Sequence, residues 1–331
     1  MPDDLLTVAD HVADRLDLSP AEISDVIEQA NFFMSLPYEE SSNGHFHHYA
    51  KKVGAPTVGF RLENQGRAFS HAEYEPVDVR LEILDYSWAV DKAVAEGSPK
   101  GKNRVIARAG LDHLMAAMFL MERQFFGGQA GGAANGFAGF PDVLNEIAET
   151  VLDGGGTNVG GATSVYLVKM GSNDVCGVMP MDSNFGMGTM KIQDMTDENG
   201  LHFPAYYTPA TTWAGIQVGG LYSIVRMANI DSTAAGSLTD SKIYDAIEAF
   251  PMGKPDYIVM NRRARTQLRN SRTPITQNAT GIAAPIPTSV EGIPILKTEG
   301  LLNDEAIVAK AMIRTRQGDG STLLSFSFFD L

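Results

Sequence analysis

Cysteine, long apolar runs and basic residues are scarce in this chain of 331 residues. Its single cysteine, Cys176, excludes an intrachain disulfide and any zinc or iron–sulfur site built from several cysteines. Because Cys176 lies in an apolar segment, we expect a small buried side chain rather than a reactive thiol. No apolar run reaches the ~18–20 residues that a membrane-spanning helix needs, so the sequence predicts no membrane partner.

Basic residues are outnumbered 26 to 40 by acidic ones, and the imbalance is uneven along the chain. Residues 1–40 hold ten acidic residues and one basic residue, a net charge of −9. Residues 250–316 hold ten basic and five acidic residues, a net charge of +5. Such asymmetry suits one part of a subunit that rests on another part of its neighbour. Two separately solvated charged helices remain an equally good interpretation.

The sequence motifs of common enzymes are missing. No G-x-S-x-G nucleophile elbow and no HExxH zinc motif occur. The glycine-rich stretches 125–139 and 153–162 lack the Gly-Lys-Ser/Thr of a phosphate loop and the dinucleotide fingerprint, so structural turns are favoured. His45, His47 and His48 have no acidic or cysteine ligand placed with them, which favours a structural role over metal binding. We therefore predict no enzyme, no cofactor and no metal site.

An amphipathic helix is predicted near the N-terminus. Ser19 to Glu22 form a capping box with proline at the first helical position, and Pro37 stops the helix. An apolar stripe follows at helical spacing, and from it we take four residues as candidates for a subunit interface: Ile23, Val26, Ile27 and Phe33. We expect this helix to lie on a neighbouring subunit and the subunit to fold without residues 1–36.

Farther along, residues 46–82 consist of short β-like pieces around polar turns, which indicates a projecting two-stranded loop. Residues 104–126 carry the longest helical pattern, about 35 Å at ~1.5 Å per residue. A second helix is predicted over 141–151, and strands are predicted within 163–179 and 206–230.

Five arginines lie between residues 262 and 272, and three of them, Arg262, Arg265 and Arg269, are close to one helical face. Guanidinium groups pair well with carboxylates, so we favour contacts with an adjacent subunit. A solvated face and nucleic-acid binding remain alternatives. Nucleic-acid binding is the weakest of the three, because the chain is acidic and no aromatic residues are interleaved among these arginines.

The same part of the chain has an ordered set of motifs. A helix from Lys242 is followed by P-D-Y-I-V-M-N (255–261), by the arginine-rich helix, and by a strand written G-I-P-I-L from Gly292. Upstream, G-F-A-G-F (136–140) follows the long helix. This order resembles the major capsid proteins of tailed double-stranded DNA bacteriophages of the Hong Kong 97 type. The resemblance covers residues 46–150 and 235–325, and its narrower form is to coats of short-tailed phages such as those infecting Bordetella.

The resemblance implies an α+β fold in four parts. These are an N-terminal arm with its helix (1–45), an extended loop (46–82), the spine helix and peripheral region (83–150), and an axial domain with the remaining β-rich peripheral segments (151–331). It also implies that many copies form pentamers and hexamers of an icosahedral head. The head would enclose packaged DNA without sequence-specific binding. The expected place is the virion, after assembly in the host bacterial cytoplasm.

The partners implied are other copies of the chain, a portal and a decoration (cement) protein. Because only about 45 residues precede the loop, too few for a fused scaffolding domain, a separate scaffolding protein is also expected. Two rival functions stay open. The same fold forms encapsulin, a bacterial nanocompartment shell, and a soluble enzyme could hold a phosphate ligand in the glycine-rich turns. Neighbouring portal or cargo genes distinguish the first rival, and size-exclusion chromatography distinguishes the second.

Overall fold

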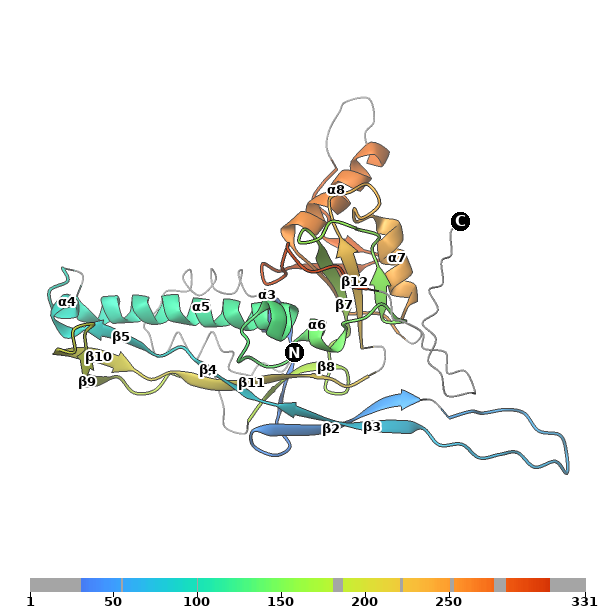
Figure 1. The fold of residues 1–331 in the computed structure, drawn as a ribbon, viewed down its shortest axis with the longest axis horizontal. Helices are drawn as coiled ribbons and strands as arrows, with labels where there is room; N and C mark the ends of the chain where they lie inside the picture. Colours follow the sequence, from blue (N-terminus) through green and yellow to red (C-terminus); the bar gives the residue numbers. More distant parts are fainter. Residues whose placement is uncertain are drawn as a thin grey trace, which may run out of the picture.

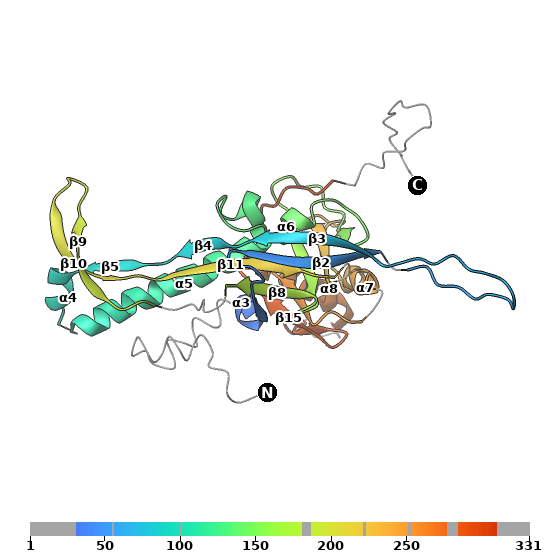
Figure 2. The same ribbon diagram turned by 90° about the horizontal axis from the view of Figure 1, so that it is seen from below.

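The computed structural model describes residues 31–54, 56–99, 101–180, 187–220, 223–250, 253–276 and 284–309 (Figure 1). A compact region is built on a six-stranded sheet, and an elongated region extends from it along the longest helix. A two-stranded hairpin projects on the other side (Figure 2). Helices and strands are mixed throughout, so the fold is α+β.

The six-stranded sheet brings together strands from both halves of the chain. Its order is β14 (Ser289–Val290), β15 (Ile293–Lys297), β13 (Tyr257–Met260), β7 (Thr163–Val168), β12 (Ile224–Ile230) and β6 (Val151–Asp153). The central strand, β7, is antiparallel to both of its neighbours, β12 and β13. The outer pairs β13–β15 and β12–β6 are parallel.

Strand β7 separates two hydrophobic cores. All six of its residues are buried, and successive side chains of a strand point to opposite faces of the sheet. Val165 and Leu167 pack with α7 (Asp240–Glu248) and α8 (Arg262–Thr276) on one face. Tyr166 packs on the other face with the end of the longest helix. Neither face of this strand is therefore exposed to solvent, unlike a half-exposed strand.

The longest helix, α5 (Lys102–Gly131), confirms the helix predicted over 104–126 and extends it at both ends. Gly110 allows this helix to pack closely against the strand that begins at Trp88, because a Cβ atom at position 110 would lie 2.7 Å from Cζ2 of Trp88. The regular helix is interrupted at Gly128, whose φ of 58° is in the region that favours glycine.

Two smaller sheets lie along α5 (Figure 2). One has the order β1 (Tyr38–Glu40), β8 (Val175–Met179), β11 (Thr211–Val218) and β4 (Glu82–Asp85). The other has the order β5 (Trp88–Asp91), β10 (His202–Thr208) and β9 (Lys191–Thr196). Short helices α3 (Asn31–Ser35), α4 (Lys92–Glu96) and α6 (Phe140–Val143) complete this region. The strands predicted within 163–179 and 206–230 are present.

The helix predicted over 141–151 is wrong. Helix α6 ends at Val143, and residues 151–153 instead form strand β6, which pairs with β12 through Val151 and Arg226. Intrinsic helix preference is weak, so hydrogen bonds to an existing sheet override it. The sequence also alternates apolar and polar residues at its C-terminal end, at Leu324, Phe326 and Phe328, and this segment lies outside the described residues.

Candidate assembly interface

The projecting hairpin consists of β2 (Phe46–Gly54) and β3 (Glu73–Arg80), joined by the loop 56–72. The two strands are antiparallel, with Phe46 opposite Arg80 and Lys52 opposite Tyr74. Most residues on both faces of this ribbon are exposed or half-buried. A two-stranded ribbon on its own is only marginally stable, so its exposure points to a structure that is completed by another molecule.

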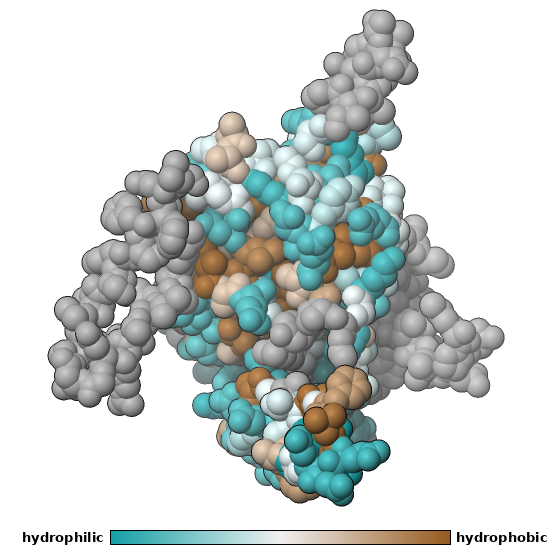
Figure 3. Space-filling view, turned by 90° about the vertical axis from the view of Figure 1, so that its right-hand side faces the viewer, coloured by the Kyte–Doolittle hydropathy of each residue, from teal (hydrophilic) through white to brown (hydrophobic). Residues whose placement is uncertain are grey.

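The loop at the end of the hairpin carries large apolar side chains with no cover. Phe60 and Phe69 are 109% and 96% exposed, and Val58 and Leu62 are also exposed. Figure 3 looks at the subunit from the side toward which the hairpin points, and hydrophobic side chains lie exposed on the lowest part of the molecule. Groups of exposed apolar side chains mark interaction sites in soluble proteins.

The base of the hairpin, by contrast, is fixed to the body of the subunit. Nε2 of His47 lies 2.5 Å from Oε1 of Gln217 on β11, and the Tyr49 hydroxyl donates to the Val218 carbonyl at 3.1 Å. His45 stacks on Trp213 with ring centroids 4.0 Å apart. These contacts hold the hairpin at a set angle and leave its tip free.

The histidines of this segment are therefore used by the chain itself. His48 completes the set with a 2.5 Å contact between its Nδ1 and Oδ1 of Asp78. Within the described ranges, no group of three His, Cys, Asp or Glu side chains could hold a metal ion. Every helix in those ranges is too short or too polar to cross a bilayer.

Helix α8 carries the five arginines, and all five contact their own chain. Arg265 Nε donates to the Pro287 carbonyl at 2.8 Å, and Arg269 Nε donates to the Ala284 carbonyl at 2.6 Å. Arg263 binds the Gly161 and Asn303 carbonyls, Arg272 pairs with Asp240, and Arg262 pairs with Glu299 at 3.2 Å.

The three candidate arginines therefore differ in availability. Arg265 and Arg269 hold the segment 284–287 against α8 and are half-buried. Arg262 keeps 75% of its side chain exposed, and its partner Glu299 is also partly exposed. Sequence spacing placed the three on one face, but only the fold shows which of them has a free guanidinium surface.

The apolar stripe of the N-terminal helix is described only at its end. Ile23, Val26 and Ile27 lie outside the described residues. Phe33 is 1% exposed and lies in a hydrophobic core of its own subunit, with its ring centroid 5.4 Å from that of Tyr38. Helix α3 packs against α5, so the Phe33 side chain is already covered within its own chain. This corrects the assignment of Phe33 to a subunit interface.

Both glycine-rich stretches fold around carboxylates of the chain. Oδ2 of Asp142 accepts hydrogen bonds from the backbone N–H groups of Gln129 and Gly139. Oδ2 of Asp231 accepts from Thr157 and Asn158 in the second stretch. A negatively charged side chain thus occupies the backbone donors that a phosphate would need, which favours structural turns over a ligand site.

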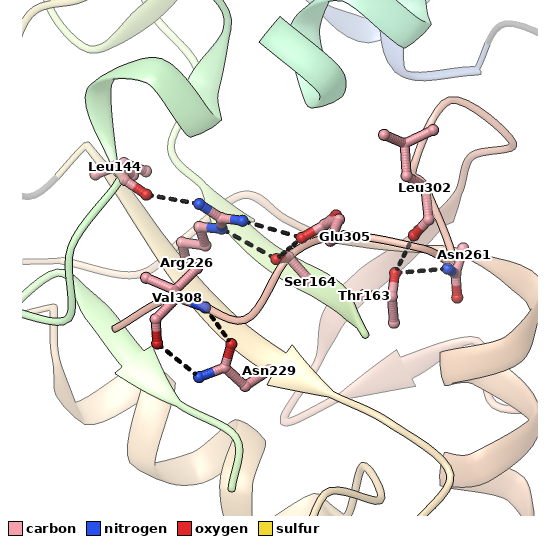
Figure 4. Close-up of polar contacts among 9 residues, drawn as sticks. All are labelled: Leu144, Thr163, Ser164, Arg226, Asn229, Asn261, Leu302, Glu305 and Val308. Atoms are coloured by element: carbon pink, nitrogen blue, oxygen red, sulfur yellow. Dashed lines mark hydrogen bonds and ion pairs between the residues drawn. The ribbon is translucent and has the colours of Figure 1, made fainter. Parts of the chain in front are cut away.

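A buried polar network joins the C-terminal described segment to the sheet (Figure 4). Arg226 on β12 donates to the Leu144 carbonyl at 2.7 Å and pairs with Glu305 at 2.9 Å. Ser164 also donates to Oε2 of Glu305. Farther along, Asn229 exchanges two hydrogen bonds with the backbone of Val308.

The Arg226–Glu305 pair is almost free of solvent, with side chains 5% and 8% exposed. Burial raises the pKa of Glu305, and the Arg226 guanidinium opposes that rise. Sequence analysis did not single out either residue. An arginine in the middle of the apolar strand I-V-R-M-A-N-I was a signal, because a buried cation requires a partner.

Glu122 on α5 was also missed. It is 0% exposed and sits where α3, α5 and the turn after β15 meet. The Thr298 hydroxyl and the Phe32 backbone N–H lie beside its carboxyl group, but neither of its oxygens has a partner with full hydrogen-bond geometry. Burial therefore dominates and raises the pKa of Glu122 to about 7.

Comparison with known proteins identifies the family. Residues 17–309 match the family described as major capsid protein GP7. No protein of the curated set matches the sequence. Among solved structures, the coat protein in the structure of bacteriophage Epsilon15 is 20% identical, with 83% of this chain and 88% of that chain covered and a TM-score of 0.61.

Two further structures are similar at lower scores. The bacteriophage JBD30 capsid is 10% identical, covers 86% of this chain and 99% of that chain, and has a TM-score of 0.49. The SrpI encapsulin of Synechococcus elongatus is 11% identical, covers 62% and 88%, and has a TM-score of 0.39. The family match spans most of the chain, and the Epsilon15 likeness shows the Hong Kong 97-type coat fold. The chain belongs to the major capsid protein GP7 family and is a structural subunit of a bacteriophage head that is assembled from copies of itself.

Proposed function

We propose that this subunit forms pentamers and hexamers that close an icosahedral shell around double-stranded DNA, and that the loop 56–72 makes a principal contact between neighbours. The observation that carries the proposal is the full exposure of Phe60 and Phe69 at the tip of a hairpin whose base is fixed. The fixed base sets where the loop projects from the subunit, and the exposed rings at its tip are available for burial against a neighbour.

The expected gain per contact is substantial. Full burial of one phenylalanine side chain is worth about 1.5–3 kcal/mol, so two rings contribute several kcal/mol before the cost of association. Because each subunit in a ring repeats the contact, small gains accumulate over the shell. Arg262 is a second candidate for this interface, since its guanidinium is the most exposed of the three candidate arginines and acidic residues dominate the chain.

The remaining partners follow from the same role. A separate scaffolding protein, a portal and a decoration protein would act with the subunit, assembly would occur in the host bacterial cytoplasm, and no step would require catalysis by this chain. The net charge of −14 supports a container that repels its DNA and releases it readily.

The test is the double variant Phe60→Ser/Phe69→Ser. We expect the far-UV circular dichroism and melting temperature of the unassembled subunit to remain as in the wild type, because exposed positions contribute within about ±0.5 kcal/mol. Negative-stain microscopy should show no closed shells. Val159→Ser, at an apolar position that is 83% exposed in the compact region, is the matched control and should assemble normally. Normal shells from the double variant would refute the proposal.

A further inference from the structure

An apolar stripe runs along the outward face of α5. Its apolar members Met115, Phe119 and Phe126 lie on one helical face together with the buried Glu122, because the four residues are separated by four, three and four positions. Phe119 is 40% exposed and its neighbour Leu120 is 39% exposed, although both are in the middle of a helix whose opposite side is buried. The stripe is therefore covered at one end and open along its middle.

The covered end is the place where the described chain begins. The ring centroid of Phe32 lies 4.8 Å from that of Phe126 and 5.8 Å from that of Phe125. Asn31 is the first described residue, so the preceding residues start from the covered end of the stripe.

The sequence that precedes Asn31 matches this surface in spacing and in length. Ile23, Val26, Ala30 and Phe33 are separated by three, four and three residues, so a helix continued back from α3 carries the first three on the side of Phe33. Phe33 is already buried in the same core as Met118 and Met121 of α5. Residues 19–30 make a helix of about 18 Å, and the α5 stripe from Met115 to Phe126 is about as long.

The charges are also complementary. Residues 1–30 contain eight acidic residues and one basic residue, a net charge of −7. The exposed charged residues of α5 are mostly basic: Lys102, Arg104, Asp112, Arg108 and Arg123. Arg104 and Arg108 precede the stretch from Met115 to Phe126, and Arg123 lies within it near its end. An acidic helix on this stretch therefore has basic side chains near both of its ends, with Asp112 as the one exposed acidic residue of α5.

We propose that residues 19–30 dock as a helix on the outward face of α5 in the same subunit, where they cover Met115, Phe119 and Leu120 before assembly. The apolar side of the N-terminal arm is then stored on its own subunit, and it becomes available to another molecule only after it leaves α5. This inference concerns the unassembled subunit, so its test does not depend on the shell function.

Disulfide trapping tests the contact directly. Val26→Cys/Phe119→Cys and Ile23→Cys/Met115→Cys are prepared as dilute unassembled subunits and oxidised; the native Cys176 is 0% exposed and does not interfere. We expect an intrachain disulfide in at least one pair, seen as a monomer with no free engineered thiol and confirmed by mass spectrometry of the linked peptides. Glu28→Cys/Phe119→Cys is the control, because Glu28 lies on the opposite side of the helix from Val26 and should not form the link.

Two outcomes overturn the proposal, provided that the variants keep the wild-type circular dichroism. One is the absence of any intrachain disulfide in both stripe pairs. The other is a disulfide that forms only between chains, which would place the arm on a neighbouring subunit.

Amide hydrogen exchange gives an independent readout without cysteines. In the unassembled wild type, residues 22–30 should exchange more slowly than an unstructured chain, and Phe119→Asp should abolish that protection. Val94→Asp, at an apolar position that is 62% exposed on α4, should leave it unchanged. Exchange of residues 22–30 at the unstructured rate in the wild type, or protection that survives Phe119→Asp, would contradict the docking.

Discussion

The six-stranded sheet and the β2–β3 hairpin place their side chains in opposite ways. In the sheet, apolar residues fill both faces, and even the charged Arg226 is buried and paired with Glu305 of a later segment. In the hairpin loop, Phe60 and Phe69 face solvent, while the polar contacts gather at the base around His47. The sheet satisfies its side chains within one subunit, and the hairpin does not.

The difference separates two kinds of stability in a shell protein. Burial inside the compact region folds the subunit, whereas burial of the loop has to wait for a neighbour. Substitutions in the sheet should therefore change folding, and substitutions in the loop should change assembly alone.

The N-terminal arm contains the boundary between the two kinds of region. Removal of residues 1–36 takes away Phe32, Phe33 and Leu36, which are at most 4% exposed. A single buried phenylalanine truncation costs about 3–5 kcal/mol, so this deletion should leave no cooperative thermal transition. Removal of residues 1–30 should retain one. We therefore expect the subunit to fold without residues 1–30 but not without residues 1–36, which was the expectation from the sequence. Equal melting curves for the two deletion variants, measured by circular dichroism, would contradict this prediction.

The buried ion pair tests the sheet itself. Arg226→Leu removes the cationic partner of the buried Glu305 carboxyl group and the donor to the Leu144 carbonyl, which should lower the free energy of unfolding by about 3–5 kcal/mol in urea titrations. In the double variant Arg226→Leu/Glu305→Leu no buried charge is left, so much of the loss should be recovered. If the double variant were less stable than Arg226→Leu, the loss could not be explained by the unpaired carboxyl group of Glu305, and this prediction would be wrong.

Glu122 should make the joint between α3 and α5 sensitive to pH. Its pKa of about 7 lies above the ordinary 4.5, so the folded subunit binds this proton more tightly than the unfolded chain. Its contribution is complete below pH 4.5 and is lost as pH rises through about 7. Glu122→Gln should remove that loss and be more stable than the wild type at pH 8 by up to about 3 kcal/mol. Unfolding curves of both proteins at pH 5 and pH 8 measure this effect. If the difference in free energy of unfolding between Glu122→Gln and the wild type were the same at both pH values, the prediction would be wrong.

The arginine helix gives the smallest and most selective effect. Arg265→Glu removes a hydrogen bond to the Pro287 carbonyl, so stability should fall by about 1–3 kcal/mol. Arg262→Glu alters an exposed pair and should change stability by no more than about 1 kcal/mol, yet reduce capsomer formation at low salt. Thermal melts and size-exclusion chromatography separate the two, and normal capsomers from Arg262→Glu would remove Arg262 from the interface.

Local patterns in the sequence were sufficient for much of the fold. The helical spacing over 104–126, the strands within 163–179 and 206–230 and the two-stranded loop over 46–82 were all predicted, and the structure contains them. Asn261 also caps α8, since its Oδ1 accepts from the Ala264 N–H at 2.8 Å. These features depend on residues a few positions apart, and backbone geometry alone relates such residues.

The candidate interface was only partly predictable. Sequence spacing placed Arg262, Arg265 and Arg269 together, but their partners at Glu299, Pro287 and Ala284 come from the folding back of a later segment. The stripe that includes Phe33 was recognised, but not the fact that Phe33 is covered by its own chain. A pattern shows that a face is apolar, and it does not show what covers that face.

The sequence by itself determined the long helix, the projecting loop and the motif order that resembles phage coat proteins, because periodicity and motif order are properties of neighbouring residues. The α+β class followed from that resemblance. Only the tertiary structure decided that Arg226 meets Glu305, 79 positions away, that Glu122 is buried without a full partner, and that residues after Leu144 leave the helix to join a sheet. Such contacts depend on how distant segments pack, and packing depends on the shape of the whole subunit rather than on any one segment.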